Sequence, residues 1–348
     1  MVRAFTSDQH TIDGAWILIT GGTGSFGQKL VETLLTRHNP AKVIILSRDE
    51  LKQFEMQGQL LAKLPRDKTD KLRFFLGDVR DRERLTTAFR NVDLVVHAAA
   101  LKQVPAAEYN PSEFIKTNIG GAENVVHAAL ANRVKQVIAL STDKACNPIN
   151  LYGATKLASD KVFVAANNIA GGIGTQFSVV RYGNVVGSRG SVVPFFRNLI
   201  KAGTDHIPIT DDRMTRFWIT LQQGVDFVIS CSGIMRGGEL FVPKIPSMKI
   251  TDLANLLAPQ LEQRVVGIRP GEKLHELMIS ADDAPATVEM HDRYVIEPMA
   301  PQFDRVSYVG ERDIHKAPAD FQYGSNTNTE WLDEDGMRAL LTAAGQLN

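Results

Sequence analysis

The chain has 348 residues, enough to bury a large core, and its 39 basic and 39 acidic residues leave no net charge. Bulk electrostatics therefore give no support to a nucleic-acid partner or to an anionic membrane, and an anionic ligand must be held by a few placed residues. The only two cysteines, Cys146 and Cys231, are too few for a disulfide framework and wrongly spaced for a metal site, so we expect no metal and a reducing cytoplasm.

The first 14 residues contain no apolar run, and nowhere do eighteen uncharged apolar residues occur together. We therefore expect a soluble protein without a secretory signal or a membrane span. Short apolar runs then alternate with segments of helical period, which predicts an α/β fold with a parallel, doubly wound Rossmann-type sheet. The predicted strands are Ala15 to Thr20, Lys42 to Leu46, Leu72 to Leu76, Asp93 to Ala98, Gln136 to Leu140 and Gln176 to Arg181.

A glycine-rich loop follows the first predicted strand. Gly21, Gly24 and Gly27 form a GxxGxxG pattern between a strand and a helix. Without side chains, the backbone at these positions can approach a pyrophosphate at the positive end of the helix. The pattern is weak alone, but in this strand-loop-helix context it predicts a dinucleotide site.

The end of the second predicted strand bears on the choice between NAD and NADP. An acid there binds the ribose 2′-hydroxyl of NAD, whereas an arginine accommodates a 2′-phosphate. Ser47 and Arg48 precede Asp49 and Glu50, so we expect NADP and assign the two acids to a helix N-terminus. The predicted cofactor-binding residues are Thr23, Gly24, Ser25, Phe26, Ser47, Arg48, Lys52, Asp78, Val79, Ala98, Tyr152 and Lys156.

The later part of the chain is less regular. Pro111 is expected to open a long helix that runs to about Asn132, and after Arg181 the alternation of strands and helices fades. We expect residues 1–182 to form the NADP-binding Rossmann domain, with some later segments returning to it, and residues 183–348 to form mainly a substrate lobe and a C-terminal arm. Segments predicted to be loop-rich or extended are Ile207 to Thr210, Phe241 to Pro246, Ile268 to Lys273 and Gly310 to Asn328.

A tyrosine and a lysine four residues apart share one face of a helix that Asn150 is expected to cap. An ammonium from Lys156 beside the phenol of Tyr152 lowers the pKa of that phenol from about 10 toward the working range, which makes a tyrosinate base. Asp143 and Lys144 lie just upstream and suggest more chemistry than an alcohol oxidation. An ordinary helix pair and a surface loop are the alternatives, but the nucleotide loop earlier in the chain makes coincidence the weaker explanation.

Together these motifs resemble the extended short-chain dehydrogenases/reductases that act on nucleotide sugars. The motifs in question are Thr20 to Gly27, Asp78-Val79, Tyr152-xxx-Lys156 and Arg181 to Asn184. Four more segments look like those of the inverting UDP-N-acetylglucosamine 4,6-dehydratases of pseudaminic acid biosynthesis, a group within that family. These segments are Ala99 to Pro105, Ser141 to Pro148, Met214 to Thr220 and Arg269 to Lys273. The resemblance implies an NADP-dependent lyase acting on UDP-N-acetylglucosamine, with hexamers as the expected assembly.

The chemistry of dehydration agrees with these residues. H5 of the sugar becomes acidic only after oxidation at C4, so the reaction needs a base for the 4-hydroxyl, a base for H5 and an acid for the departing 6-hydroxyl. Tyr152, Lys144 and Asp143 can fill these roles in that order, with bound NADP keeping the hydride. Lys156 is expected to hold the nicotinamide ribose, and Thr142 to hydrogen-bond the sugar O4.

Lys144 is where the chain departs from the retaining dehydratases, which carry a glutamate at this position. A lysine acts as a base only when neutral, so its pKa of about 10.4 must fall by several units, as desolvation in a closed pocket can bring about. Asp143 must in turn be protonated to act as an acid. The two groups titrate as a coupled pair, and the sequence assigns no microscopic state to either.

Two arginines offer the planar forks that suit a diphosphate, Arg216 and Arg269. A structural ion pair remains the alternative for Arg216, and plain packing the alternative for Val192. His97, at a strand end, is expected to be a satisfied buried histidine, and Phe217 and Trp218 are expected to be packing residues. With the resemblance added, the predicted substrate-binding residues are Lys102, Asn184, Val192, Arg216, Arg269 and Glu272.

Two other functions fit part of the pattern. A UDP-sugar 4-epimerase shares the cofactor, the tyrosine and the diphosphate site but needs no Asp143–Lys144 pair. A non-catalytic NADP-binding regulator uses the fold without turnover, and such proteins often lack the Tyr152–Lys156 pair.

Overall fold

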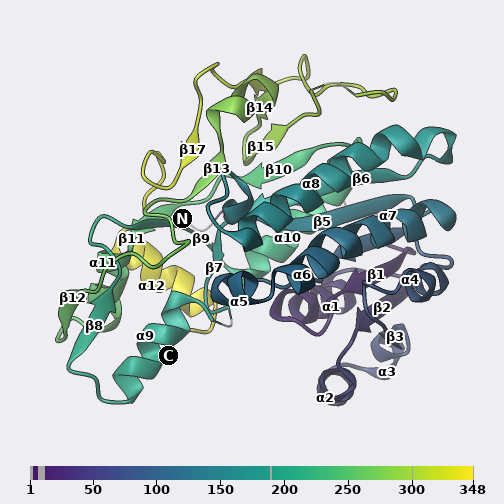
Figure 1. Cartoon of the computed structure of the whole chain (residues 1–348). Helices are drawn as coiled ribbons and strands as arrows, with labels where there is room; N and C mark the ends of the chain where they lie inside the picture. The colour runs from purple at the N-terminus through teal and green to yellow at the C-terminus, as the bar shows by residue number, and fades with distance from the viewer. Residues whose placement is uncertain (1–2, 7–11, 189, 300, 348) are drawn as a thin grey trace.

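The main sheet has ten strands, and Figure 1 shows β1, β2 and β3 toward one edge and β14 and β15 toward the other. The computed structural model describes residues 3–6, 12–188, 190–299 and 301–347, so the expectation for residues 1 to 14 falls partly outside them. The strand order is β16-β14-β15-β10-β6-β5-β4-β1-β2-β3. The bounds are β1 (Trp16–Thr20), β2 (Lys42–Ser47), β3 (Leu72–Leu76), β4 (Leu94–His97), β5 (Gln136–Thr142), β6 (Gln176–Tyr182), β10 (Leu240–Pro243), β14 (Thr287–Glu289), β15 (Arg293–Ile296) and β16 (His315–Lys316).

The predicted doubly wound sheet is confirmed. From β3 through β10, each neighbouring pair of strands is parallel, and β15, β14 and β16 then continue the sheet antiparallel. Every strand predicted between residues 15 and 181 is present, with its ends within two residues of the expected ones. The order reverses between β1 and β4, and such a switch point leaves a crevice at the carboxyl ends of the strands where ligands bind.

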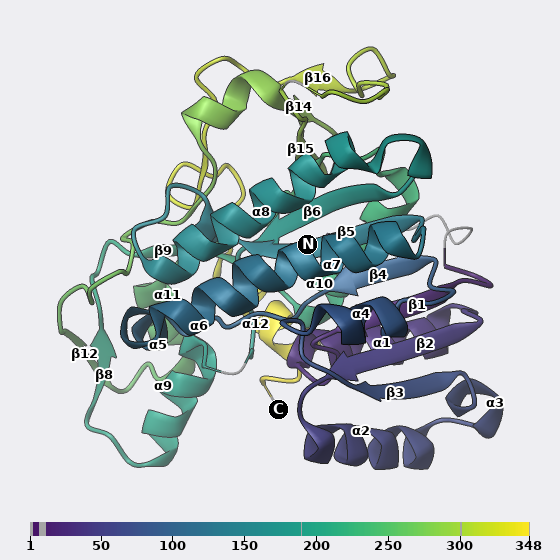
Figure 2. The ribbon, with the colours of Figure 1, turned by 45° about the vertical axis from the view of Figure 1, so that its right-hand side comes forward.

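Helices cover both faces of the sheet. In Figure 2, α4 (Arg82–Ala88), α7 (Gly121–Ala131) and α8 (Leu151–Ala170) lie on one face, and α1 (Ser25–Arg37) and α10 (Leu221–Ile234) pack together on the other. The remaining helices are α2 (Glu50–Lys63), α3 (Arg66–Thr69), α5 (Val104–Tyr109), α6 (Pro111–Phe114), α9 (Val192–Lys201), α11 (Ile250–Leu257) and α12 (Glu334–Ala343). Within the described residues, no helix is both long enough and apolar enough to cross a membrane.

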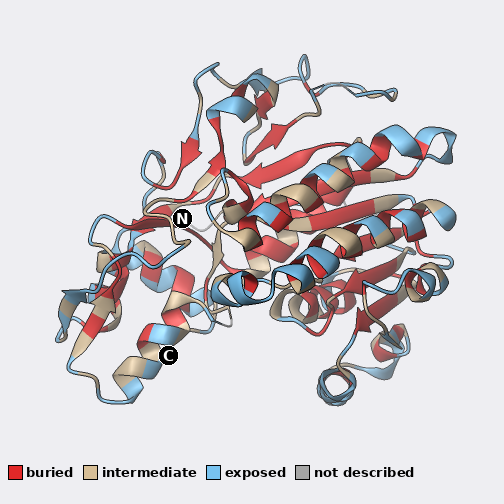
Figure 3. Ribbon diagram, viewed as in Figure 1, coloured by how far each residue is buried: buried red, intermediate tan, exposed pale blue. Residues whose placement is uncertain are grey.

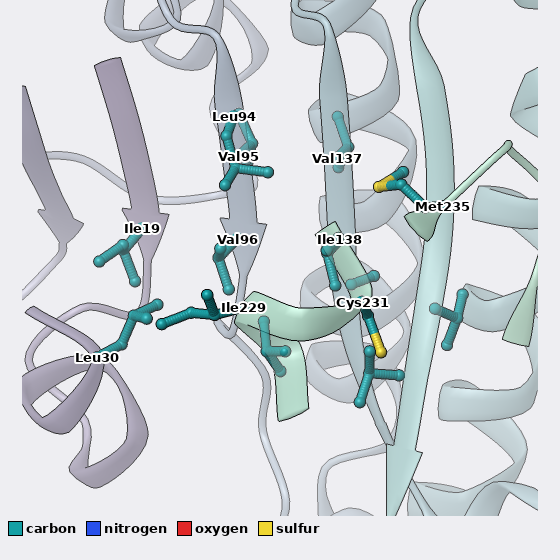
Figure 4. Packing of buried hydrophobic residues seen from close by; sticks show 14 of the residues in the cluster. Ile19, Leu30, Leu94, Val95, Val96, Val137, Ile138, Ile229, Cys231 and Met235 are labelled. Atoms are coloured by element: carbon teal, nitrogen blue, oxygen red, sulfur yellow. The ribbon is translucent and has the colours of Figure 1, made fainter. Parts of the chain in front are cut away.

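The core lies between the sheet and these helices, and Figure 3 shows the strands of the sheet largely buried. In Figure 4, Ile19, Val96 and Ile138 project from neighbouring strands toward Leu30 of α1 and Ile229 of α10, and all five are at most 3% exposed. Burial of each such side chain contributes about 1.5–3 kcal/mol to folding, so this layer fixes the strand ends that form the site.

The long helix predicted from Pro111 is interrupted. A π-helical segment, η2 (Ile115–Gly120), separates α6 from α7, which ends at the C-cap residue Asn132. Within η2 the buried side chain of Asn118 accepts from the Leu101 N–H at 2.9 Å and donates to the Leu101 carbonyl at 2.9 Å and to Thr155 Oγ1 at 3.0 Å. Apolar periodicity does not reveal one extra residue in a turn.

The loops predicted over Phe241 to Pro246 and Ile207 to Thr210 were wrong, because each contains a strand, whereas most of the extended arm predicted from Gly310 to Asn328 lies outside helices and strands. The loop expected from Phe241 to Pro246 contains β10, which is fully buried and enters the main sheet between β6 and β15. The polar segment Gly310 to Asn328 contains β16 and β17 (Tyr323–Gly324), and Tyr323 is buried. Strands β16 and β17 have two residues each, too few to show a period of two, and β10 and β17 are buried by partners distant in sequence.

Three small sheets lie outside the main sheet. Strand β9 (Thr215–Ile219) lies between β7 (Asn184–Val185) and β11 (Ser247–Lys249), and β8 (His206–Ile209), in a segment predicted to be a loop, pairs with β12 (Glu262–Val265). The third sheet pairs β13 (Leu277–Ile279) with β17. Since β10, α10, β14 and β15 belong to the main sheet and its helices, the part of the chain after residue 182 contributes to both regions.

Candidate active site

The predicted site residues line a single cavity of about 1380 Å³ at the carboxyl ends of the parallel strands. The cavity extends from the glycine-rich loop after β1, past the ends of β2, β4 and β5, to the loop before β13. Its wall includes every residue predicted to bind cofactor or substrate or to act in catalysis. Positions spread over some 250 residues of sequence are therefore brought to one crevice.

The glycine-rich loop has the close approaches that a dinucleotide site requires. Gly21 has a positive φ of 66°, and a Cβ there would lie 2.9 Å from the Ala99 backbone. A Cβ on Gly27 would lie 2.5 Å from Gly22, so the start of α1 packs directly onto the loop. With Gly24 as its N-cap, α1 directs free N–H groups into the cavity, and this cradle fits a pyrophosphate.

The end of β2 presents Arg48 while Asp49 is used by the next helix. Asp49 caps α2 by accepting the Lys52 N–H at 3.0 Å and pairs with Lys52 Nζ at 2.9 Å, which confirms the helix N-terminal role predicted for it. Arg48 lies at the cavity wall with its guanidinium 3.6 Å from the Asp78 carboxylate. Ser47 accepts from Gln53 through its carbonyl and its hydroxyl.

Tyr152 lies in the first turn of α8, which Asn150 caps by accepting the Gly153 N–H at 2.7 Å, as predicted. The phenol is 8% exposed, and burial raises the pKa of Tyr152 to about 12, against the lowering effect of the Lys144 charge and of a hydrogen bond with Thr142. The expectation of a lowered tyrosine pKa is therefore wrong for the protein by itself, because burial outweighs the nearby charge.

The Lys156 ammonium is bound to a backbone carbonyl and does not contribute the charge beside the Tyr152 phenol that the sequence predicted. Its ammonium donates to the Leu140 carbonyl at 2.7 Å, and burial lowers the pKa of Lys156 although the Asp160 carboxylate opposes this shift. Asp160 in turn accepts from Ser141 at 2.7 Å. The cation that lowers the pKa of Tyr152 is Lys144, whereas the sequence indicated Lys156.

Asp143 and Lys144 form an ion pair in the short 3₁₀ turn after β5, in which the carboxylate is buried and the lysine side chain is 28% exposed. The Lys144 Nζ is 3.2 Å from Asp143 Oδ1, and Thr142 Oγ1 donates to the same oxygen at 2.8 Å. Asp143 is 1% exposed, and its Oδ2 has no hydrogen-bond partner among the described residues. Asp143 also lines the cavity, and a buried carboxylate oxygen without a partner in such a residue is a candidate to meet a ligand or to carry a proton.

The pKa of Lys144 is raised, not lowered. Burial alone lowers it, but the carboxylates of Asp143 and Glu276 outweigh burial. The lowered lysine pKa expected from the sequence is thus wrong for the protein without substrate, because a second carboxylate lies beside the amine.

That second carboxylate, Glu276, is the site residue the sequence analysis missed. Its Oε1 is 3.3 Å from Lys144 Nζ and 3.5 Å from Arg216 Nε, although 132 residues separate it from Lys144. No local motif marks it. The one sign in the sequence is an acidic residue directly before the apolar run Leu277 to Ile279, and its spacing from Lys144 does not indicate that the two side chains meet.

The two predicted phosphate-binding arginines differ. Arg216 is 5% exposed and donates to the carbonyls of Thr215, Leu274 and Lys273, so its fork is largely occupied within the protein. Arg269 is exposed on the cavity wall, with its guanidinium 6.0 Å from the centre of the Phe195 ring. The geometry favours a structural pairing for Arg216 and leaves Arg269 as the better phosphate ligand.

The other predicted substrate residues surround this region. Asn184 lies in β7 and Val192 begins α9, both partly exposed in the cavity, and Glu272 lies 3.6 Å from Arg216. Lys102 lines the cavity in the loop after β4.

Three residues expected to be structural are buried. Phe217 and Trp218 of β9 are at most 1% exposed, as packing residues should be. His97 is buried beside Thr20, with Nδ1 2.8 Å from the threonine hydroxyl, and burial and the Lys156 charge lower the pKa of this histidine to about 3. The predicted satisfied histidine is confirmed.

The fold and the site define an enzyme of the Rossmann-type epimerase and dehydratase class. The X-ray structure of Pen from Bacillus thuringiensis has a TM-score of 0.85 and 34% identity, and covers 97% of this chain and 99% of that one. A dTDP-glucose 4,6-dehydratase from Streptomyces venezuelae, DesIV, solved with NAD and TYD bound, has a TM-score of 0.64 and 25% identity, over 74% of this chain and 86% of its own.

The chain belongs to the polysaccharide biosynthesis protein family, whose model matches residues 17–298. An inverting UDP-N-acetylglucosamine 4,6-dehydratase of Campylobacter jejuni subsp. jejuni serotype O:23/36 (strain 81-176) is 58% identical over 327 residues, 92% of this chain and 96% of the relative. The expected family membership is confirmed, and a nicotinamide cofactor is consistent with the NAD held by the related DesIV structure.

Proposed function

We propose that this protein is a UDP-N-acetylglucosamine 4,6-dehydratase that inverts C5 and uses NADP. The observation that carries the proposal is the Asp143–Lys144 pair, 3.2 Å apart, in the cavity that the nucleotide loop and Tyr152 also line. A 4-epimerase has no step that needs this pair. The 58% identical relative, an inverting dehydratase, supports the same conclusion.

The proposed product is UDP-2-acetamido-2,6-dideoxy-β-L-arabino-hex-4-ulose, and the proposed place of the reaction is the first step of pseudaminic acid-type nucleotide-sugar biosynthesis. The motifs of residues 99–105, 141–148 and 214–220 support this assignment through their resemblance to enzymes of that group.

The first step is oxidation at C4. Tyr152 takes the proton of the 4-hydroxyl, and its phenolate is stabilised by the Lys144 charge and the Thr142 hydrogen bond, the two interactions that already oppose burial. A nicotinamide, when bound, accepts the hydride from C4 and later returns it to C6. Lys156 lines the same cavity wall, and its proposed role is to hold the nicotinamide ribose.

Elimination follows from one proton shared by Asp143 and Lys144. In the resting ion pair the proton is on the amine, and its transfer to the carboxylate across 3.2 Å gives a neutral base and a protonated acid without any proton from solvent. Lys144 then takes H5 as the C5–C6 double bond forms. The 6-hydroxyl leaves with the Asp143 proton as water, and the pair returns to its resting charges. C5 then takes a proton from solvent on the opposite face, which gives the L configuration, and Tyr152 releases to solvent the proton that it took from the 4-hydroxyl.

Cofactor choice is proposed from the end of β2. Arg48 and Lys52 supply positive charge beside Ser47 on the cavity wall, and Asp49 is engaged in capping α2. This arrangement favours the 2′-phosphate of NADP over a bare ribose hydroxyl. The remaining proposed cofactor contacts are those of Thr23 to Phe26, Asp78, Val79 and Ala98.

We propose that one residue binds the diphosphate of the substrate through charge and that other residues form the pocket for the sugar and the uridine. The exposed fork of Arg269 takes the diphosphate, and Lys102, Asn184, Val192 and Glu272 line the sugar and uridine pocket. We further propose a cytoplasmic homo-oligomer, with a hexamer expected from the family resemblance and a monomeric sedimentation coefficient as the contrary result.

Incubation with UDP-N-acetylglucosamine and mass spectrometry of the product tests the function. Loss of one water from the substrate mass is the expected result, and in heavy water C5 should carry deuterium in an L-configured sugar. A product of unchanged mass with altered C4 stereochemistry would identify a 4-epimerase, and no change under any cofactor supply would favour a regulator. A D-configured 4-keto sugar as the first product would contradict inversion.

A further inference from the structure

Glu276 is fixed in place by its backbone and buried by its surroundings. It lies directly before β13, donates its N–H to Ser325 Oγ at 2.9 Å and accepts the Ser325 N–H at 2.8 Å. Its side chain is 2% exposed. A carboxylate this deeply buried is costly unless it is paired, so its partners indicate its role.

Those partners are two cations, Lys144 and Arg216, which lie in different parts of the fold. Glu276 Oε1 is 3.3 Å from Lys144 Nζ, in the turn after β5, and 3.5 Å from Arg216 Nε, in β9. Arg216 cannot easily leave, because three backbone carbonyls hold its terminal nitrogens. Glu276 Oε2 is buried and accepts no hydrogen bond from the described residues. The carboxylate is therefore anchored on one side and reaches Lys144 on the other.

We propose that Glu276 is a positioning residue for elimination, holding the Lys144 amine against Asp143 and keeping one proton on that pair. The inference rests on the proposed dehydratase function. A lysine amine sits on a flexible four-carbon stem, and one carboxylate alone does not fix where it points. Between Asp143 Oδ1 at 3.2 Å and Glu276 Oε1 at 3.3 Å, the amine is held from two sides.

The proton count follows from the charges that face the amine. The pKa of the Lys144 amine is shifted by four neighbours: Asp143, Glu276, Arg216 and Tyr152. The charged groups of this cluster are two carboxylates, Asp143 and Glu276, and two cations, Lys144 and Arg216. Without the Glu276 charge, one carboxylate remains against two cations. The amine then loses its proton at lower pH, and above that pH the Asp143–Lys144 pair has no proton to give to the leaving hydroxyl.

This role affects one step of the reaction. C4 oxidation uses the Lys144 charge only to stabilise the Tyr152 phenolate, whereas elimination needs the proton that Asp143 and Lys144 share. Loss of Glu276 should therefore slow elimination more than oxidation, and reduced nicotinamide should accumulate. A residue that only supports the fold would slow both steps together.

The test compares Glu276→Gln, which removes the charge and keeps an acceptor, with Glu276→Asp, which keeps the charge on a shorter side chain. Single-turnover rates of oxidation and of water loss are measured across pH on the NADP-loaded protein with UDP-N-acetylglucosamine. We expect Glu276→Gln to slow elimination by up to about 100-fold, as small misplacements do, and to slow oxidation by less, through the weaker support of the Tyr152 phenolate. The alkaline limit of elimination, meaning the pH above which its rate falls because Lys144 has lost its proton, should move down by about 1–3 pH units in this variant.

Glu276→Asp should keep the parent alkaline limit and a reduced elimination rate. Glu272→Gln is the matched control, because Glu272 pairs with the same Arg216, at 3.6 Å, from the neighbouring loop. Whatever its effect on substrate affinity, it should leave the alkaline limit of elimination in place.

Parent-like elimination and an unchanged pH limit in Glu276→Gln would overturn the inference, as would an equal slowing of oxidation and elimination. Failure of the proposed function would be visible earlier, since the unmodified protein would then release no water from UDP-N-acetylglucosamine.

Discussion

Replacing Lys144 by methionine should stop elimination while slow C4 oxidation continues. Methionine keeps an unbranched stem but has no amine to accept H5. Because a placed general base contributes about 10²–10⁴-fold, elimination should fall by that factor. Reduced nicotinamide should then accumulate, seen by its absorbance, and deuterium should no longer enter C5 in heavy water. The apparent affinity for UDP-N-acetylglucosamine should stay within about tenfold of the parent.

The same change should also destabilise the fold. Lys144 neutralises Asp143 at 3.2 Å and Glu276 at 3.3 Å, and its side chain is 28% exposed. Breaking a buried ion pair costs about 3–5 kcal/mol, and partial exposure places this case near the lower end. At about 2.1 cal/mol/K of unfolding entropy per residue, a chain of 348 residues loses about 1.4 °C per kcal/mol, so the Tm should fall by about 4–5 °C.

The loss of stability in Lys144→Met should depend on pH, and the charges left in the site determine whether it grows or shrinks as the pH rises. In the variant, the two buried carboxylates of Asp143 and Glu276 are left with Arg216 as their one nearby cation, so their charged forms cost more in the folded state than in the unfolded chain. The Tm deficit should therefore be larger near about pH 8 than near about pH 5. In the parent, the raised pKa of Lys144 gives stabilisation that is complete below the ordinary lysine pKa and is lost only as pH rises through the folded value.

Circular dichroism melts of the parent and the variant at the two pH values measure this difference. A variant that melts within about 2 °C of the parent at both would show that the pair contributes little to stability, the result typical of exposed ion pairs. Undiminished elimination would refute the assignment of Lys144 as the C5 base and leave a dehydratase with a different base.

Three further predictions concern the tyrosine, the cofactor and the loop. Tyr152→Phe should abolish turnover while UDP-sugar binding, measured by calorimetry, stays within about tenfold of the parent; retained activity would mean that another group deprotonates the 4-hydroxyl. Protein denatured after purification should release NADP, and Arg48→Asp should shift the preference toward NAD, whereas mostly NAD in the native extract would contradict the cofactor proposal. Gly27→Ala puts a methyl group 2.5 Å from Gly22 and should cost about 1–3 kcal/mol with weakened cofactor binding, measured by melts and by titration with NADP; parent-like values for both would show that α1 can shift away from the loop.

The parallel strands and the nucleotide loop could be predicted because their signals are local. Strands β1 to β6 are continuous apolar runs, and the glycines at 21, 24 and 27 follow β1 at the spacing that a pyrophosphate cradle requires. Asn150 could be assigned as a cap for the same reason, since its acceptor is used three residues away.

The electrostatics of the site could not be predicted, because they depend on contacts between distant segments. Glu276 meets Lys144 across 132 residues and reverses the expected shift in the lysine pKa. Lys156 shares a helix with Tyr152, yet its amine donates to Leu140 on the neighbouring strand. Spacing along a helix shows which side chains can meet, and the surrounding strands decide which of them do.

The π-helical turn at η2 has a mechanical consequence. Through Asn118, it joins Leu101, in the loop beyond β4, to Thr155, one turn into α8. The loop that carries Lys102 and the helix that carries Tyr152 are thus pinned to a common point and cannot move apart independently. We expect amide hydrogen exchange at Leu101 and in the first turns of α8 to slow in concert when a ligand fills the cavity.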